Sequence, residues 1–86
     1  KHGCLLLAEK TDPHQPTTDL SADWKPTGRS FLSMIWPHLS KLDLEHVYLY
    51  ANDLTQSGKV LKFEAWTGIP VDTIEVNGNA LQVNFY

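Results

Sequence analysis

The residues that could hold a metal ion or act as nucleophiles are scattered along this chain. Its four histidines are His2, His14, His38 and His46, and its single cysteine is Cys4. No histidine lies four residues from a second ligand on a predicted helix, and one cysteine cannot build a thiolate site. We therefore expect no metal ion and no other cofactor.

Sequence signatures of catalysis are also lacking. Nucleophilic catalysis requires a serine, cysteine or threonine beside a base that a third group holds in place. Neither that arrangement nor a Gly-X-Ser-X-Gly, Walker or dinucleotide-binding motif is present. Cys4 lies in an apolar run that ends at Ala8, where a thiol is typical of a small core residue. The sequence therefore identifies no catalytic residue. It favours a noncatalytic protein over an enzyme.

Aromatic and charged side chains instead gather on one predicted sheet face. Val47, Leu49 and Ala51 alternate with bulkier residues at the period of a strand, and a second strand from Lys59 to Trp66 is predicted to pair with it as a hairpin. The face opposite the apolar residues, which we call the predicted aromatic face, carries His46, Tyr48, Tyr50, Lys62, Glu64 and Trp66. Because one short helix can cover only the other face of the sheet, we expect these rings to be exposed.

Three roles remain open for the predicted aromatic face. Exposed cross-strand aromatic pairs stabilise sheets by roughly 0.2 to 1 kcal/mol each and need no further function. Tyrosine and tryptophan are also typical of protein interfaces, and a self-complementary sheet face suits a two-fold dimer. In the third role, the tyrosine hydroxyls, His46 and Glu64 supply the polar contacts of a small-ligand pocket.

A long loop from Lys10 to Gly28 precedes these strands. Prolines interrupt it repeatedly, and its residues show no helical or strand periodicity. Long loops in compact domains are typical of functional lids or of disordered segments. Trp24 stands alone in this loop among charged residues, and it either covers an edge of the core or anchors a lid or a partner.

A short helix is predicted between the long loop and the later strands. Ser30 is suited to cap its first turn. Pro37 disfavours helical geometry at the residue before it, so we expect the regular helix to end near Trp36, with one kinked turn through Leu42 as the alternative. The apolar stripe that should face the sheet is Phe31, Ile35 and Leu39.

Both ends of the chain are predicted strands. The apolar run from Gly3 to Glu9 favours a strand buried on both faces over a piece of helix. From Val71 to Phe85 the apolar residues alternate around Asn77-Gly78, a dipeptide preferred in type I′ turns. That turn would pair Val76 with Asn79 and Ile74 with Leu81, with Ile74, Val76, Leu81, Val83 and Phe85 on one face and Thr73, Glu75, Gln82 and Asn84 on the other.

These elements predict a single α+β domain over residues 1–86, with the element order β-α-β-β-β-β. We expect a mostly antiparallel, curved sheet of about five strands, with one main helix on one face. A second domain is excluded because domains run to roughly 50 to 250 residues.

Charge and composition exclude further classes of protein. Seven basic and ten acidic residues give a net charge of -3, so the chain lacks the basic excess that nonspecific nucleic-acid binding requires. The longest apolar run, from Cys4 to Ala8, is far shorter than the roughly 20 residues that span a bilayer, so we expect no membrane segment. A single cysteine cannot form an intramolecular disulfide, which favours a reducing compartment, and we expect a cytoplasmic protein.

From these observations we expect a noncatalytic protein-interaction or modulator domain. Its partner would be a second copy of the chain or another protein, because one helix cannot cover both faces of the sheet. The alternative is a small-ligand-binding protein or a small enzyme, with a pocket between the predicted aromatic face and the 10–28 loop. The candidate binding residues are Tyr48, Tyr50, Trp66, His46, Lys62, Glu64 and Trp24.

Overall fold

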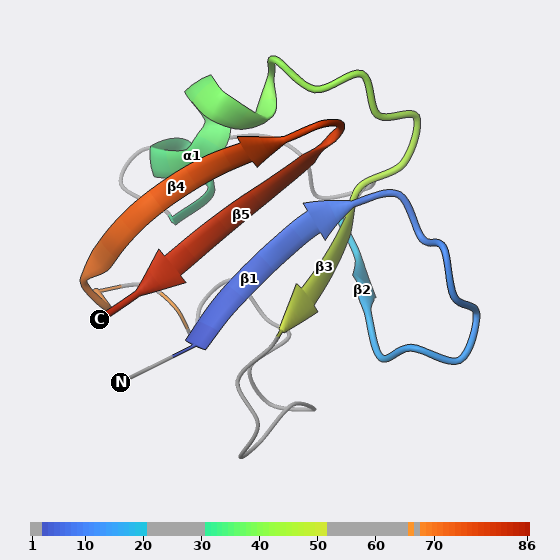
Figure 1. The fold of residues 1–86 in the computed structure, drawn as a ribbon, viewed down its shortest axis with the longest axis horizontal. Coiled ribbons are helices and arrows are strands. Elements are labelled where there is room, and N and C mark those ends of the chain that lie inside the picture. The colour runs from blue at the N-terminus through green and yellow to red at the C-terminus, as the bar shows by residue number, and fades with distance from the viewer. Residues whose placement is uncertain (1–2, 21–30, 52–65, 67) are drawn as a thin grey trace.

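The computed structural model describes residues 3–20, 31–51, 66 and 68–86 (Figure 1). Its elements are β1 (Gly3–Ala8), β2 (Thr18–Asp19), α1 (Phe31–Leu39), β3 (Tyr48–Ala51), β4 (Val71–Asn77) and β5 (Ala80–Phe85). The strands form one sheet in the order β2-β3-β1-β5-β4, and all neighbouring strands are antiparallel. The predicted α+β class, with an antiparallel sheet of five strands and one helix, is confirmed for the described part of the chain.

The order of the elements along the chain differs from the prediction. The two-residue strand β2 lies inside the predicted 10–28 loop and precedes α1, and it pairs with Tyr48 and Leu49 of β3. Of the predicted strand 59–66, only Trp66 belongs to the described residues, and it begins a turn in which the Ile69 amide donates to its carbonyl at 3.3 Å. The predicted hairpin between that strand and β3 therefore lies outside the described residues.

The first strand, β1, occupies the centre of the sheet between β3 and β5. Leu5 and Leu7 are fully buried on the face that packs against α1. Cys4, Leu6 and Ala8 point to the opposite face, because side chains alternate along a strand, and there they are only half-buried. The predicted strand is confirmed. Its predicted burial on both faces holds fully only for the face that packs against α1.

The helix α1 packs its predicted apolar stripe onto the sheet. Phe31, Ile35 and Leu39 are all buried in the core, as expected from their spacing. The prediction that the regular helix ends near Trp36 is wrong, because α1 continues through Leu39 with Pro37 inside it. Pro37 cannot donate an amide hydrogen bond and its ring crowds the preceding turn, but the following turn is closed by the Ser40 amide, which donates to the Trp36 carbonyl at 2.9 Å.

The β4–β5 hairpin has a different turn from the one predicted. Asn77 pairs with Ala80, so the two loop residues are Gly78 and Asn79. Gly78 has a φ of 60°, and no non-glycine residue in the described part of the chain has a positive φ. Glycine with positive φ at the first loop position is the pattern of a type II′ turn, so the prediction of a type I′ turn at Asn77-Gly78 is wrong.

The observed turn shifts the register of β4 against β5, but every side chain of the hairpin stays on its predicted face of the sheet. Ile74 pairs with Val83 rather than with Leu81, and Val76 pairs with Leu81 rather than with Asn79. Each partner has moved by two residues, and a shift by an even number leaves every side chain on its original face.

The observed turn makes a long-range contact. The side-chain amide of Asn79 donates to the Asp43 carbonyl at 2.6 Å, and its oxygen accepts from the Asp43 amide at 2.8 Å. This Asn79 clamp joins the hairpin turn to the connection between α1 and β3, and no local sequence pattern reports it.

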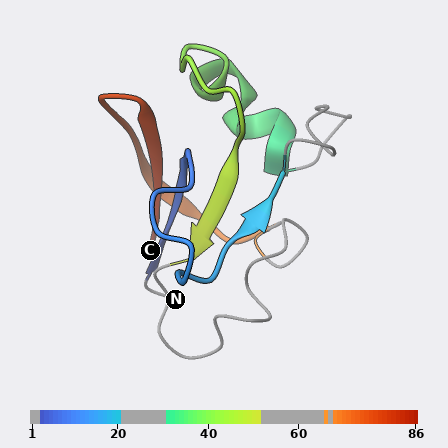
Figure 2. The same cartoon turned by 90° about the vertical axis from the view of Figure 1, so that its right-hand side faces the viewer.

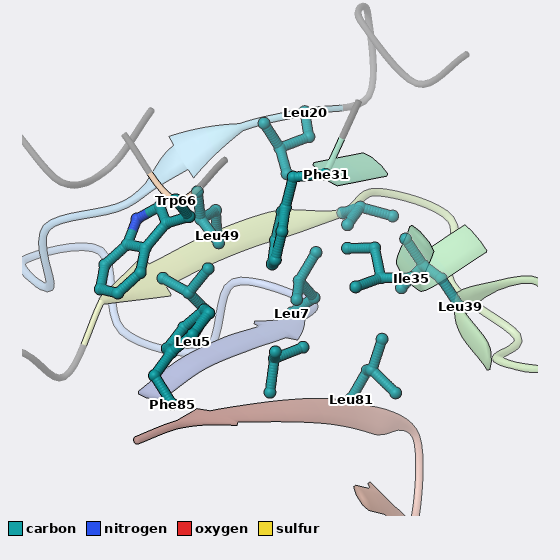
Figure 3. Packing of buried hydrophobic residues seen from close by; sticks show 12 residues of the cluster. Leu5, Leu7, Leu20, Phe31, Ile35, Leu39, Leu49, Trp66, Leu81 and Phe85 are labelled. Atoms are coloured by element: carbon teal, nitrogen blue, oxygen red, sulfur yellow. The ribbon is translucent and has the colours of Figure 1, made fainter. Parts of the chain in front are cut away.

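The core lies between α1 and one face of the sheet, as the close view in Figure 3 shows. Trp66 is 1% exposed and stacks on Phe85, with ring centroids 4.5 Å apart and planes 22° from parallel. Phe31 approaches the same Phe85 ring at 6.0 Å. Aromatic rings from the helix, the last strand and the segment before β4 therefore close the core together.

Candidate interaction surface

The sheet has a second face turned away from α1, which we call the outer face. Figure 2 views the sheet from the β2 edge, with α1 on the side opposite this face. The strand register assigns to the outer face Cys4, Leu6 and Ala8 of β1, Tyr48 and Tyr50 of β3, Thr73 and Glu75 of β4, and Gln82 and Asn84 of β5. No helix of the described residues lies over this face.

The centre of the outer face is apolar. Leu6 of the central strand lies between Tyr50 on one neighbouring strand and Gln82 on the other. Cys4, Leu6 and Ala8 are half-buried. Antiparallel sheets that meet water on one face normally alternate apolar and polar residues, so apolar side chains on both faces of β1 depart from that pattern.

The β4 side of the outer face is polar and internally hydrogen-bonded. Asn84 donates from its side-chain amide to the Thr73 hydroxyl at 2.8 Å and to the Glu75 carboxylate at 3.0 Å. Its oxygen accepts from the Gln82 amide at 2.8 Å. Four side chains on two strands thereby hold one another in fixed positions beside the apolar centre.

Tyr50 is directed to the outer face but is buried. Its side chain is 3% exposed, and its hydroxyl donates to the Glu9 carbonyl at 3.0 Å. A buried tyrosine hydroxyl normally requires such a partner. The expectation that Tyr50 is an exposed ring of the sheet surface is therefore wrong, and its contact fixes the start of the connection between β1 and β2.

Tyr48 lies at the centre of a small charged cluster at the end of the outer face. Its ring is half-buried and has the Lys10 ammonium 5.9 Å from the centroid, within cation–π range. The His46 ring lies 6.5 Å from the Tyr48 ring, and the backbone amide of His46 donates to the Glu9 carboxylate at 2.8 Å. His46 also lies 4.0 Å from the exposed Glu45 carboxylate.

The charged cluster has the composition of a binding surface. Lys10 and His46 are exposed, and their side chains flank an aromatic ring. Such groups can contact a partner or a polar ligand, and the cluster contains no nucleophile held beside a base by a third group.

Trp66, one of the predicted binding residues, is buried and not exposed as expected. The alternation from Lys59 to Trp66 assigned it to the predicted aromatic face, yet it is buried in the core against Phe85. Burying an indole of this size in the core removes far more apolar area from water than leaving it on a sheet surface.

The other predicted binding residues divide into two groups. Tyr48 and His46 lie close together at the outer face, while Lys62, Glu64 and Trp24 lie outside the described residues. Sequence reasoning missed Leu6, Glu9 and Lys10. The unalternating apolar run of β1 was the signal that could have identified Leu6, because it places an apolar residue on each face.

Within the part of the chain that the structure describes, no group of three or more histidine, cysteine, aspartate or glutamate side chains is placed to hold a metal ion. Among the same residues, no helix has both the length and the apolar character needed to cross a membrane.

Comparisons of the chain with protein-family models, with curated proteins and with solved structures find no match. The fold is that of a small α+β protein.

Proposed function

We propose that this chain is a noncatalytic protein-interaction domain that forms a homodimer through the outer face of its sheet. The observation that supports this proposal is the apolar character of β1 on both faces. Leu5 and Leu7 fill the core, while Cys4, Leu6 and Ala8 are half-buried on the outer face. A central strand with this composition is typical of sheets that are covered on both sides.

The arrangement of side chains on the outer face resembles that of a protein interface. Its apolar centre on β1 is flanked on one side by the hydrogen-bonded side chains around Asn84. On the other side lies the charged cluster around Tyr48. Interfaces characteristically combine an apolar centre with a polar rim.

A second copy is the occupant that the size of the chain favours. Small domains of about 60 residues bury only about 60% of the surface that the unfolded chain exposes, so covering another apolar surface adds substantial stability. A two-fold axis through the outer face would bring Leu6 of one copy near Leu6 of the other, because such an interface uses the same patch twice. Modulation of another protein would follow if that protein competes for the same face.

Sedimentation of the wild type and of the Leu6→Lys variant tests the proposed dimer. The wild type should sediment as a dimer at tens of micromolar. Leu6→Lys places a charge at the centre of the interface and should raise the dimer dissociation constant by at least about tenfold, because a buried unpaired charge is costly. Circular dichroism of the same samples establishes that the variant is folded.

Val76→Lys is the matched control for this experiment. Val76 is 48% exposed on the face of β4 that points away from the outer face, so a lysine there should leave the dimer intact. The proposal is refuted if the wild type is monomeric at tens of micromolar. It is also refuted if a folded Leu6→Lys variant dimerises as tightly as the wild type.

A cytoplasmic location is part of the same proposal. The chain has one cysteine, and Cys4 lies at the proposed interface, where a reducing compartment keeps it as a thiol. The dimer should then persist in the presence of a reducing agent, which sedimentation also measures.

A second candidate function is binding of a small polar ligand beside Tyr48. The observation that favours it is the contact between the start of the 10–28 loop and this ring, in which the Lys10 ammonium lies 5.9 Å from the ring centroid. Chemical shifts of Lys10, His46 and Tyr48 on addition of citrate, a small polyanion, test this reading. Shifts that saturate and that disappear in Lys10→Gln would support it, whereas unchanged spectra would exclude this class of ligand.

A further inference from the structure

The free edge of the sheet at β4 is a second surface, separate from the outer face. β4 is the last strand in the order β2-β3-β1-β5-β4, so one of its long sides has no neighbouring strand among the described residues. At seven residues it is far longer than β2, the two-residue strand at the opposite edge. A long edge strand presents unpaired backbone donors and acceptors to any segment able to pair with it.

The register identifies which backbone groups point outward from this edge. Asn77 and Ala80 flank the two-residue turn and form a hydrogen-bonded pair, and such pairs alternate with pairs that exchange no hydrogen bonds. Ile74 and Val76 therefore belong to the second kind, so their amides and carbonyls point away from β5. These four groups form the start of a ladder for an added strand.

The side chains beside this ladder are acidic. Asp72 and Glu75 are exposed on β4, and residues 66–86 contain no lysine, arginine or histidine. Glu75 is held in place by the Asn84 amide at 3.0 Å. The two carboxylates give this segment of 21 residues a charge of -2 out of the chain's -3.

The same features disfavour pairing between two copies at this edge. Two β4 strands would bring four carboxylates together, and the register centred on Glu75 would place Glu75 directly opposite itself. The pairing of β4 with β5 also has a bulge between Val71 and Thr73, and bulges in edge strands limit edge-to-edge association. A strand of opposite charge meets no such repulsion.

We propose that the β4 edge binds an extended basic segment of another protein by strand addition. Ile74 and Val76 supply the backbone hydrogen bonds. Lysine or arginine at alternate positions of the segment lies beside Thr73 and Glu75 on the outer side, where opposite charges on neighbouring strands attract. The backbone edge of β4 is not part of the proposed dimer interface, although Thr73 and Glu75 also belong to the polar rim of that interface.

Fluorescence anisotropy with a labelled, end-capped heptapeptide of alternating lysine and valine tests this site at about 0.15 M salt, where charges more than roughly 8 Å apart are screened. The peptide should bind, while the same peptide with glutamate in place of lysine should not. A lysine peptide carrying N-methyl groups on alternate amides keeps its charge but loses its ladder donors, and it should bind at least about tenfold more weakly. Slower hydrogen exchange at the amides of Ile74 and Val76 in the complex would locate the peptide at the edge.

Two pairs of substitutions separate the edge from general charge attraction. Asp72→Asn with Glu75→Gln should weaken binding of the lysine peptide by about 3- to 10-fold, the scale of two exposed charge pairs. Asp12→Asn with Asp19→Asn changes the net charge equally and should leave binding within about twofold, since these exposed carboxylates lie before and on β2, the strand at the opposite edge of the sheet.

The proposal fails if the lysine and glutamate peptides bind equally, if N-methylation has no effect, or if both pairs of substitutions weaken binding to the same extent. Absence of exchange protection at Ile74 and Val76 would also overturn it. Repeating the titration on Leu6→Lys keeps this test independent of the proposed dimer, because that variant should bind the peptide as well as the wild type. Self-association that D72N/E75Q strengthens would instead identify a second copy as the occupant of the edge.

Discussion

The Asn79 clamp gives the sharpest test of how this fold is held together. Its two hydrogen bonds, of 2.6 and 2.8 Å, connect a hairpin turn to the backbone of Asp43, 36 residues earlier. A hydrogen bond contributes roughly 0.5 to 1.5 kcal/mol net, and these are solvent-exposed, so Asn79→Ala should lower the free energy of unfolding by about 1 to 2 kcal/mol. With a urea m-value of about 1 kcal/mol per molar for a chain of this size, the midpoint should fall by about 1 to 2 M.

Urea unfolding followed by tryptophan fluorescence measures this change, with Asn77→Ala as the matched control. Asn77 lies one residue before Gly78 on the same hairpin, and its side chain makes no hydrogen bond to the described residues. Its removal should change stability by less than about 0.5 kcal/mol. Equal midpoints for Asn79→Ala and Asn77→Ala would refute the conclusion that the clamp stabilises the fold.

Three further substitutions test the remaining contacts, each by urea unfolding. Trp66→Ala removes the ring stacked on Phe85 and should cost about 3 to 5 kcal/mol, and a loss below about 1 kcal/mol would contradict the burial of Trp66 in the core. Gly78→Ala should cost about 1 to 2 kcal/mol because the φ of 60° is unfavourable for alanine, and no atom lies within 4 Å of the added Cβ; an unchanged stability would argue against the type II′ turn. Tyr50→Phe should cost about 0.5 to 1.5 kcal/mol through loss of the bond to the Glu9 carbonyl, whereas a neutral change would mean that this bond does not anchor the connection after β1.

The spacing of apolar residues along the sequence correctly predicted the helix and several of the strands. The apolar run of β1, the stripe of Phe31, Ile35 and Leu39 and the alternation of β4 and β5 all appear where they were expected. Alternation with a period of two fixes the face of each side chain even when the register shifts. The faces of the hairpin were therefore correct although its turn was not.

The candidate surface could be predicted only in part. The alternation around Tyr48 placed it and His46 together, and the structure confirms that their rings lie 6.5 Å apart. The same alternation assigned Trp66 and Tyr50 to an exposed face, and both are buried. Periodicity reports the direction of a side chain relative to its neighbours, but it carries no information about which other segment packs over that side chain.

The sequence by itself determined that this chain forms an antiparallel α+β domain with one apolar helix face, since those features follow from the spacing of apolar residues. Tertiary structure decided that β1 lies between β3 and β5, that α1 continues past Pro37, and that the turn residues are Gly78 and Asn79. The strand order, the packing of Leu39 at the end of α1 and the clamp at the turn all involve contacts between residues far apart in the chain. Their free energies, such as that of the Asn79 clamp, are comparable to the local preferences that they override.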